Sequence, residues 1–210
     1  MIDFLRYNFL FSLILLSCSS AENVARPSDV QLRMETSLGT IEIEVDVAAA
    51  PVTAKNFLRL ADNGHLDGGT FYRTVSPDND KGSPVISVIQ GGIFDAEGPF
   101  PPIVHETTKD TGLLHVDGAI SMARGAVGTA TTEFFICVGD QPALDYGAMR
   151  NPDKQGFAVF GRVVKGMDVV KAIHDQPSDA PTESDYMRGQ IIEEPVGIIA
   201  VKRVVSRAPE

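Results

Sequence analysis

Residues 31–46 read QLRMETSLGTIEIEVD, and this stretch determines the fold class. In its second half, Ile41, Ile43 and Val45 alternate with acidic residues. A hydrophobic repeat of two is typical of a strand that buries one face. The stretch therefore predicts two strands joined by a turn at Ser37-Leu38-Gly39.

Further along the chain, short strands outnumber helices. A helical period is predicted over residues 51–63, with Pro51 in the first turn and Gly64 just past the end. A second helix is predicted over residues 166–174. Further strands are predicted over 70–75, 85–90, 119–123, 133–138, 157–163 and 197–201, with a polar turn at 76–83 and a loop at 176–190. This pattern indicates an all-β barrel or sandwich with helical caps, and periodicity alone does not choose between the two.

The composition favours one acidic domain. The chain has 210 residues, of which 43% are hydrophobic, and a formal net charge of −10. Nucleic-acid binding needs clustered cations for phosphate contacts. No run of Lys or Arg occurs, so we expect no nucleic-acid partner.

The N-terminus has the pattern of an export signal. Residues 9–16 (FLFSLILL) form an apolar run after Arg6, and the run is short for a membrane span. We therefore assign residues 1–17 to a signal peptide, 18–30 to a polar tether and 31–206 to the folded domain. We expect the protein in the periplasm or cell envelope.

Two processing sites fit this leader. Leu15-Leu16-Ser17-Cys18 resembles a bacterial lipobox, in which Cys18 would carry a lipid. Ser19-Ser20-Ala21 instead fits ordinary cleavage after Ala21. Only the first reading gives the protein a membrane contact, through its lipid.

The remaining candidate ligands do not predict a metal or redox site. The second cysteine, Cys137, lies in an apolar strand and is interpreted as a buried free thiol. The four histidines lack close ligand spacing, so we expect no metal. Residues 78–82 (DNDKG) lack the spacing of an EF-hand and are read as a turn.

Several segments in order resemble the cyclophilin family of peptidyl-prolyl cis-trans isomerases. Each is weak alone, but their order and spacing together are specific. They are Pro51 to Phe57, Phe71-Tyr72-Arg73, Ile89-Gln90-Gly91-Gly92, Gly118 to Ala123, Glu133-Phe134-Phe135-Ile136, and Phe157 to Val163 before Gly166-Met167. The resemblance covers residues 31–205.

The resemblance implies a closed eight-stranded antiparallel barrel capped by two helices. The substrate groove would lie on the outer face of the barrel. The activity would be isomerisation of X-Pro bonds in exported proteins. It would need proline-containing polypeptides as substrates and no cofactor, and we expect a monomer.

The family pattern also assigns roles to individual residues. Arg73 matches the catalytic arginine, and Gln90 matches the residue beside it that binds the substrate backbone. Phe135 matches the floor of the proline pocket. Strand alternation should then turn Phe134 into the barrel core.

Five further positions match the substrate-binding surface. Val88 and Leu144 match apolar walls of the proline pocket. Ala123 and Arg124 match the strand edge that pairs with the substrate backbone. Phe157 stands where many relatives carry a pocket histidine.

Other positions depart from the family pattern. Ser87 replaces a pocket Phe, and Ala143 replaces a Trp or Phe. Glu133 stands where Gln is usual, and Arg124 where Asn is usual. These changes predict a looser pocket with an altered rim.

Less specific interpretations stay open at this point. Arg73 could be a surface arginine that packs its stem on the face of Phe71 and Val75, and Arg124 could be a solvated loop charge. The whole domain could bind prolyl segments or unfolded chains without turnover. It could also be a structural envelope protein anchored at Cys18.

Overall fold

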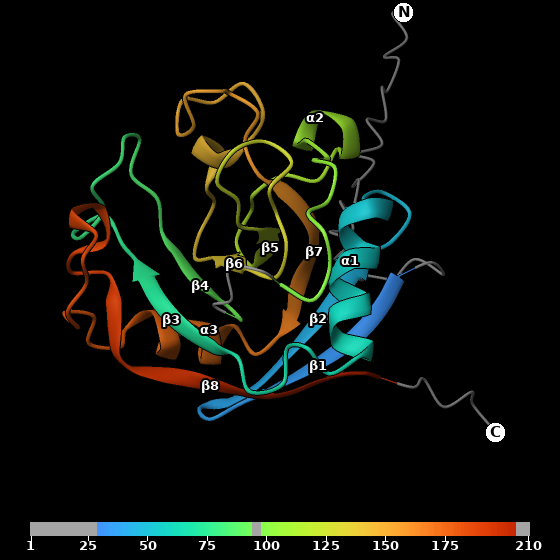
Figure 1. Cartoon of the computed structure of the whole chain (residues 1–210), viewed down its shortest axis with the longest axis horizontal. Helices are drawn as coiled ribbons and strands as arrows, with labels where there is room; N and C mark the ends of the chain where they lie inside the picture. The colour runs from blue at the N-terminus through green and yellow to red at the C-terminus, as the bar shows by residue number, and fades with distance from the viewer. Residues whose placement is uncertain (1–28, 94–97, 205–210) are drawn as a thin grey trace, which may run out of the picture.

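The computed structural model describes residues 29–93 and 98–204. Within them, eight antiparallel strands close a barrel in the order β1-β2-β7-β5-β6-β4-β3-β8 (Figure 1). The strands are β1 (Asp29–Thr36), β2 (Gly39–Asp46), β3 (Thr70–Val75), β4 (Val88–Gly92), β5 (Ala119–Met122), β6 (Phe134–Cys137), β7 (Ala158–Lys165) and β8 (Ile191–Arg203). The closed eight-stranded barrel is thus confirmed, and the sandwich alternative is wrong.

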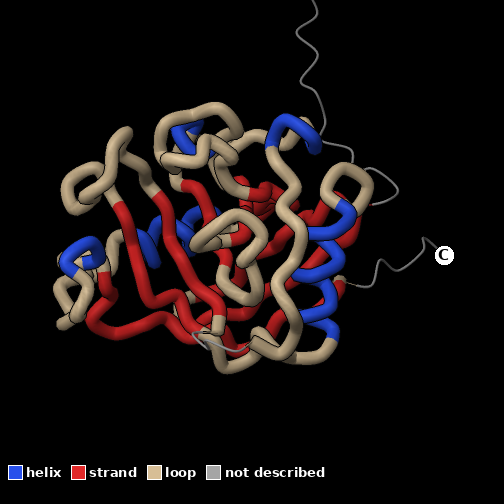
Figure 2. Tube along the Cα trace, turned by 45° about the horizontal axis from the view of Figure 1, so that its top comes forward, coloured by secondary structure: helices blue, strands red, loops and turns tan. Residues whose placement is uncertain are grey.

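Both predicted helices are present, and a third short one was missed. Helices α1 (Pro51–Asp62) and α3 (Met167–His174) flank the strands on two sides of the barrel (Figures 1 and 2). The missed helix, α2 (Thr108–Thr111), is a single turn closed by a capping box between Thr107 and Asp110. One turn is too short to show a helical period in the sequence, although the capping pair is visible there.

The inside of the barrel is filled by aromatic rings. Phe57 of α1 meets Phe134 edge-on at 5.3 Å and lies 4.8 Å from Phe160, measured between ring centroids. Phe71 meets Phe134 edge-on at 5.6 Å. All four rings are fully buried, so α1 is fixed to the barrel by the same core that joins β3, β6 and β7.

Strand β6 separates two hydrophobic layers. Phe134 and Ile136 belong to the barrel core, while Phe135 and Cys137 belong to a second cluster on the outer side. Successive side chains of a strand point to opposite faces, which is the alternation expected for Phe134 and Phe135. The outer cluster is what places a hydrophobic floor outside the barrel.

Several strand boundaries differ from the sequence expectation. Strand β4 begins at Val88 rather than Val85, because side chains of Asp80 and Gln141 take the backbone N–H groups of Ile86 and Ser87. Strand β8 runs over 13 residues, well beyond the predicted 197–201. Strand β1 begins at Asp29, within the segment assigned to the tether.

Two glycines at the end of β4 allow the backbone to pass close to its neighbours. A Cβ atom on Gly91 would lie 2.7 Å from the Thr70 carbonyl oxygen. Gly92 has a φ of +136°, and a Cβ there would lie 2.7 Å from the Thr132 carbonyl oxygen. The glycines therefore bring β3, β4 and the start of β6 together, which sets Arg73, Gln90 and Glu133 side by side.

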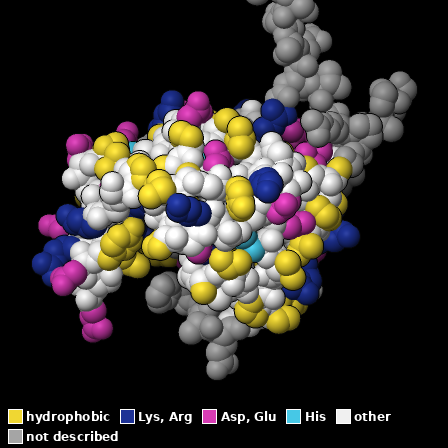
Figure 3. Space-filling model, turned by 90° about the horizontal axis from the view of Figure 1, so that it is seen from above, with side chains coloured by type: hydrophobic (Ala, Val, Ile, Leu, Met, Phe, Trp, Pro, Cys, Tyr) yellow, Lys and Arg dark blue, Asp and Glu magenta, His cyan; other side chains and the backbone are white. Residues whose placement is uncertain are grey.

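The surface carries both signs of charge. In the view from above, Lys and Arg side chains are interspersed with Asp and Glu, and hydrophobic side chains are scattered among them (Figure 3). None of the helices in the described ranges is long and apolar enough to cross a membrane.

Candidate active site

A β-bulge sets the direction of Arg73. The pairing of β3 with both of its neighbours shifts register between Phe71 and Arg73. Phe71 consequently points into the barrel core, whereas Val75 belongs to the outer cluster. The expectation that Arg73 shares a face with Phe71 is therefore wrong, because the bulge interrupts the alternation.

Two glutamine side chains hold the Arg73 guanidinium. Nε and Nη2 donate to Gln190 Oε1 at 3.0 and 2.6 Å, and Nη1 donates to Gln90 Oε1 at 2.8 Å. These bonds use three of the five N–H groups of a guanidinium, which leaves one each on Nη1 and Nη2. Burial lowers the pKa of Arg73 somewhat, but a guanidinium stays charged in proteins.

A pocket of about 250 Å³ opens beside Arg73 on the outer face of the barrel. It brings together all eight residues that the family pattern assigned to catalysis and substrate binding. They are Arg73, Val88, Gln90, Ala123, Arg124, Phe135, Leu144 and Phe157. These eight residues come from β3, β4, β6, a short 3-10 helix (Pro142–Leu144) and the loops around them, so the pocket exists only in the closed barrel.

The pocket floor is rigid and aromatic. The Phe135 ring stacks on the His115 ring at 5.8 Å with an interplanar angle of 11°, and it meets Phe157 edge-on at 5.2 Å. His115 is buried between the Asp145 carboxylate, 2.8 Å from Nδ1, and the Ser121 hydroxyl, 3.1 Å from Nε2. Burial lowers the pKa of His115 despite Asp145, so the imidazole under the floor is neutral at pH 7.

Sequence reasoning missed four residues that line this pocket, namely Ile86, Arg150, Asn151 and Tyr186. Ile86 lies one residue before Ser87, the position where the family pattern has a pocket Phe. The Ser87 hydroxyl instead lies 3.0 Å from His174 Nε2 on α3. Ser87 itself does not line the pocket, because the segment before β4 is not extended as a strand, and the looser pocket stays a prediction.

Arg150 joins three loops at the rim of the pocket. Both of its Nη atoms bind the Asp80 carboxylate, at 2.7 and 2.8 Å, and they also donate to the Pro84 carbonyl and the Tyr186 hydroxyl. The side chains of Arg150 and Asp80 are 6% and 0% exposed. Burial raises the pKa of Asp80, but Arg150 and two backbone N–H groups outweigh it and hold that pKa below its usual range.

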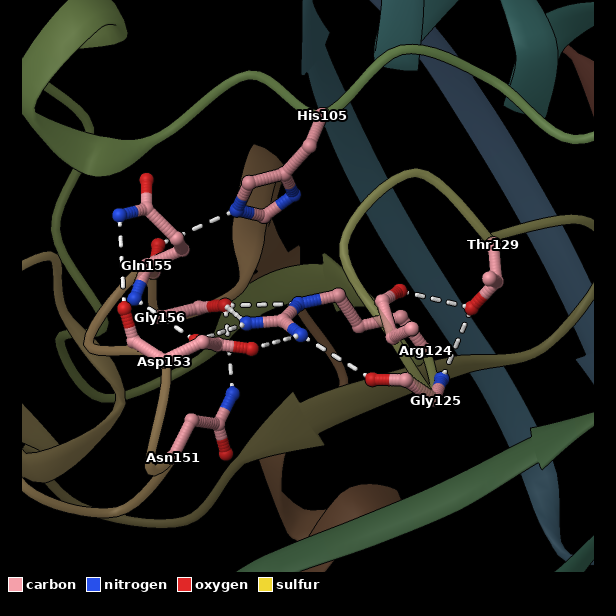
Figure 4. A network of polar contacts seen from close by, with 9 residues as sticks. His105, Arg124, Gly125, Thr129, Asn151, Asp153, Gln155 and Gly156 are labelled. Carbon is pink, nitrogen blue, oxygen red and sulfur yellow. Dashed lines mark hydrogen bonds and ion pairs between the residues drawn. The ribbon is translucent and has the colours of Figure 1, made fainter.

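Arg124 is not a solvated loop charge, because its side chain is 2% exposed. Its guanidinium donates to both oxygens of Asp153 and to the carbonyls of Gly125 and Gly156 (Figure 4). It also lies 5.2 Å from the centre of the Phe157 ring. Arg124 thus ties the loop after β5 to the loop before β7, and it forms part of the pocket wall.

A half-buried glutamate, Glu133, lies behind Gln90, and its Oε1 atom is buried. Gln90 Nε2 donates to Glu133 Oε2 at 3.0 Å and to the Tyr72 hydroxyl at 2.7 Å, and the Tyr72 hydroxyl also donates to Glu133 Oε2. Glu133 does not line the pocket. Its link to the pocket is the hydrogen bond from Gln90.

The other candidate groups take structural positions. Cys137 is buried in the outer cluster, and burial raises the pKa of its thiol beyond the usual range. Among residues 29–93 and 98–204, no three His, Cys, Asp or Glu side chains are grouped to hold a metal ion. Cys18, the predicted lipidation site, lies outside the described residues.

The fold and the site together define a closed eight-stranded barrel protein whose outer face carries a pocket with an aromatic floor and an arginine at its side. The model of the cyclophilin-type peptidyl-prolyl cis-trans isomerases matches residues 31–199. The chain belongs to this family, and it is a peptidyl-prolyl cis-trans isomerase.

Curated relatives carry the same activity in their names. A peptidyl-prolyl cis-trans isomerase of Acinetobacter baylyi is 36% identical over 83% of this chain and 86% of its own. Peptidyl-prolyl cis-trans isomerase A of Dickeya dadantii is 33% identical over 85% of this chain and 86% of its own.

Solved structures agree on the fold. A crystal structure of a cyclophilin-type isomerase of Cryptosporidium parvum superposes with a TM-score of 0.63, covering 85% of this chain and 99% of that one. A second structure of that protein, determined in the presence of the dipeptide Ala-Pro, gives a TM-score of 0.62 and covers 84% and 99% of the two chains. Their sequence identities are 18% and 19%, so this likeness concerns the fold alone.

Proposed function

We propose that Arg73 directs a free N–H group at the prolyl nitrogen of a substrate whose proline ring rests on Phe135. The observation that carries this proposal is that the side-chain amides of Gln90 and Gln190 hold the Arg73 guanidinium. Its three internal hydrogen bonds go to neutral oxygens, so both its charge and two of its N–H groups are left for a ligand.

The chemistry requires a small but directed stabilisation. Amide resonance gives the X-Pro bond a barrier near ~20 kcal/mol. In the twisted state the prolyl nitrogen becomes pyramidal and regains its lone pair, so a donor aimed at it favours that state over both planar forms. A charged hydrogen bond contributes about 1.5–3 kcal/mol. An acceleration of about 10⁴-fold needs roughly 5.5 kcal/mol. The apolar pocket supplies the rest, by gripping the ring and excluding water.

We propose proline-containing polypeptides as the substrates. The walls formed by Val88, Leu144 and Phe157 are apolar and suit a pyrrolidine ring. The similar Cryptosporidium parvum protein was crystallised in the presence of Ala-Pro, which is the smallest peptide of this class.

Two variants test the role of Arg73 against that of the pocket. Arg73→Ala should slow isomerisation of an X-Pro peptide by about 100-fold, measured by NMR exchange, while changing peptide affinity little. Phe135→Ala should weaken peptide binding as well as catalysis. A binding module without turnover would instead show no difference in exchange rate between the wild type and Arg73→Ala.

We further propose that the protein acts on exported proteins and is lipid-anchored through Cys18. The apolar run at 9–16 and the lipobox-like residues 15–18 support this. Incorporation of labelled palmitate and accumulation of precursor with globomycin are expected. A mature N-terminus at Glu22 would show cleavage after Ala21 and remove the anchor.

A further inference from the structure

The hydrogen bonds around Gln90 connect the pocket to the half-buried carboxyl of Glu133. Gln90 Oε1 accepts from Arg73, and Gln90 Nε2 donates to Glu133 and to the Tyr72 hydroxyl. Gln90 therefore lies between a cation in the pocket and a carboxyl behind it. Glu133 and Tyr72 stand on the far side of this amide from the ligand.

The two flanking groups determine which way the amide points. A guanidinium has only N–H donors, whereas an ionised carboxylate has only acceptors. Gln90 satisfies both only with its oxygen toward Arg73 and its NH₂ toward Glu133. Turning the amide over would place NH₂ against a guanidinium and oxygen against a carboxylate.

Protonation of Glu133 removes half of this constraint. A neutral carboxyl carries an O–H and can donate to Gln90 Oε1, so the reversed amide becomes acceptable on that side. In the reversed orientation, Arg73 Nη1 loses its acceptor at Gln90. The guanidinium then rests on Gln190 alone, and its free N–H groups are no longer fixed toward the pocket.

The surroundings of Glu133 favour its neutral form at a higher pH than usual. Glu133 Oε1 is buried and has no hydrogen-bond partner in the part of the chain that the structure describes. Burial raises the pKa of the Glu133 carboxyl, although hydrogen bonds from Tyr72 and Gln90 oppose the rise. In that same part of the chain, the titratable groups facing this carboxyl are the Tyr72 phenol in direct contact and Arg73 through Gln90. Burial and Glu133 raise the pKa of Tyr72 further, so the phenol stays a donor.

We propose that Glu133 is a positioning residue whose ionisation fixes Gln90, and through it Arg73, and so makes isomerisation sensitive to acid. The proposal rests on the isomerase function above. The wild type is most active with Glu133 ionised, and its activity falls as pH drops through the raised pKa of this group. The expected fall is about two- to tenfold, because Arg73 loses one of its three orienting hydrogen bonds and keeps the two to Gln190.

The pH profile of kcat/KM for the full chain tests this proposal. Glu133→Gln keeps both donor and acceptor at the site and should remove the acid limb. Glu133→Leu should lower activity by about two- to tenfold at every pH. Glu106→Gln is the matched control, because Glu106 binds the first turn of α1 at Val52 and Thr53, away from the pocket. This control should keep the wild-type profile.

NMR signals of the Gln90 side-chain amide test the role of Glu133 separately from the isomerase function. The side-chain ¹⁵N signal of Gln90 and the Arg73 Nε signal should titrate together in the wild type and stay constant in Glu133→Gln. This titration can be recorded without any substrate. An identical acid limb in the wild type and Glu133→Gln, or a Gln90 signal that does not move with pH, would overturn the proposal.

The stability of the fold gives a further check. Ionisation of Glu133 should raise activity but lower stability. A carboxyl whose pKa is raised on folding favours the folded state most below its unfolded value, 4.5, and this contribution is lost as pH rises through the folded pKa. Glu133→Gln should therefore unfold at higher denaturant than the wild type at neutral pH. The difference should shrink as pH falls toward 4.5, and a constant difference would contradict the raised pKa.

Discussion

Arg73 and Arg150 both line the same pocket, but their guanidinium groups have different partners. Among the described residues, Arg73 donates only to the neutral amide oxygens of Gln90 and Gln190. Arg150 pairs with both carboxylate oxygens of Asp80 and also binds the Pro84 carbonyl and the Tyr186 hydroxyl.

The difference teaches that position in a pocket does not by itself give an arginine a functional role. A carboxylate partner neutralises the charge and occupies the donors, which makes Arg150 and Arg124 parts of the wall. Amide partners orient the guanidinium without neutralising it, so Arg73 keeps charge and donors for a ligand. Variants that change these partners should therefore affect stability at Arg150 and activity at Arg73.

The largest effect is expected for Arg150→Met. It leaves the Asp80 carboxylate buried without its cation, which should destabilise the fold by about 3–5 kcal/mol. Urea unfolding measures this. Adding Asp80→Asn should restore part of the loss because it removes the stranded charge, and no recovery in the double variant would contradict the ion pair.

Arg73→Lys should reduce kcat/KM about 30-fold, or roughly 2 kcal/mol, with little change in stability. A lysine keeps the charge but cannot bind both glutamines in the fixed fork. A coupled assay on an X-Pro peptide measures the loss of kcat/KM, and thermal unfolding measures the stability. Activity near the wild-type level would mean that charge alone suffices.

Gln190→Glu places a carboxylate beside Arg73 and makes its environment resemble that of Arg150. We expect about a tenfold loss of kcat/KM, close to ~1.4 kcal/mol, because the neutralised guanidinium attracts the prolyl nitrogen less. Gln190→Met is the control, since it removes the support without adding charge. Equal losses in the two variants would argue against the neutral-support interpretation.

Arg124→Met should destabilise the fold by about 1–2 kcal/mol, less than Arg150→Met. Its partner Asp153 has a side chain that is 34% exposed, so water can solvate the carboxylate after the change. The same urea experiment compares the two arginines. An effect as large as that of Arg150→Met would show that exposure of the carboxylate partner does not matter.

The smallest effect is the acid dependence of the Asp80 pair. Because the pKa of Asp80 is lowered on folding, its stabilisation is present above the unfolded value, 3.8, and is lost as pH falls through the folded value. The wild type should therefore show a stability loss below pH 3.8 that Asp80→Asn lacks. If the wild type and Asp80→Asn lost stability identically in acid, ionised Asp80 would not stabilise the fold.

Much of the barrel was predictable because its strands obey local rules. The alternation in 41–45 and the opposite faces of Phe134 and Phe135 follow from period two, and both predicted helices are present. The bulge between Phe71 and Arg73 was not predictable, since it depends on pairing with β4 and β8. Family order located the eight pocket residues, and their catalytic roles stay predictions.

The missed parts of the site depend on contacts between distant segments. Gln190 reaches Arg73 across 117 positions, and Arg150 reaches Asp80 across 70. Neither pairing leaves a local pattern in the sequence. Arg124 appeared to be a loop charge for the same reason, because its partners Asp153 and Gly156 lie about thirty positions away.

The junction at Arg150 has a consequence for redesigning substrate preference. The loop of Asp80 and Pro84, the loop of Arg150 itself and the loop of Tyr186 meet at one guanidinium. A chimera that receives one of these loops from another isomerase should lose part of the hydrogen bonding at this guanidinium. Exchanging all three together should preserve it.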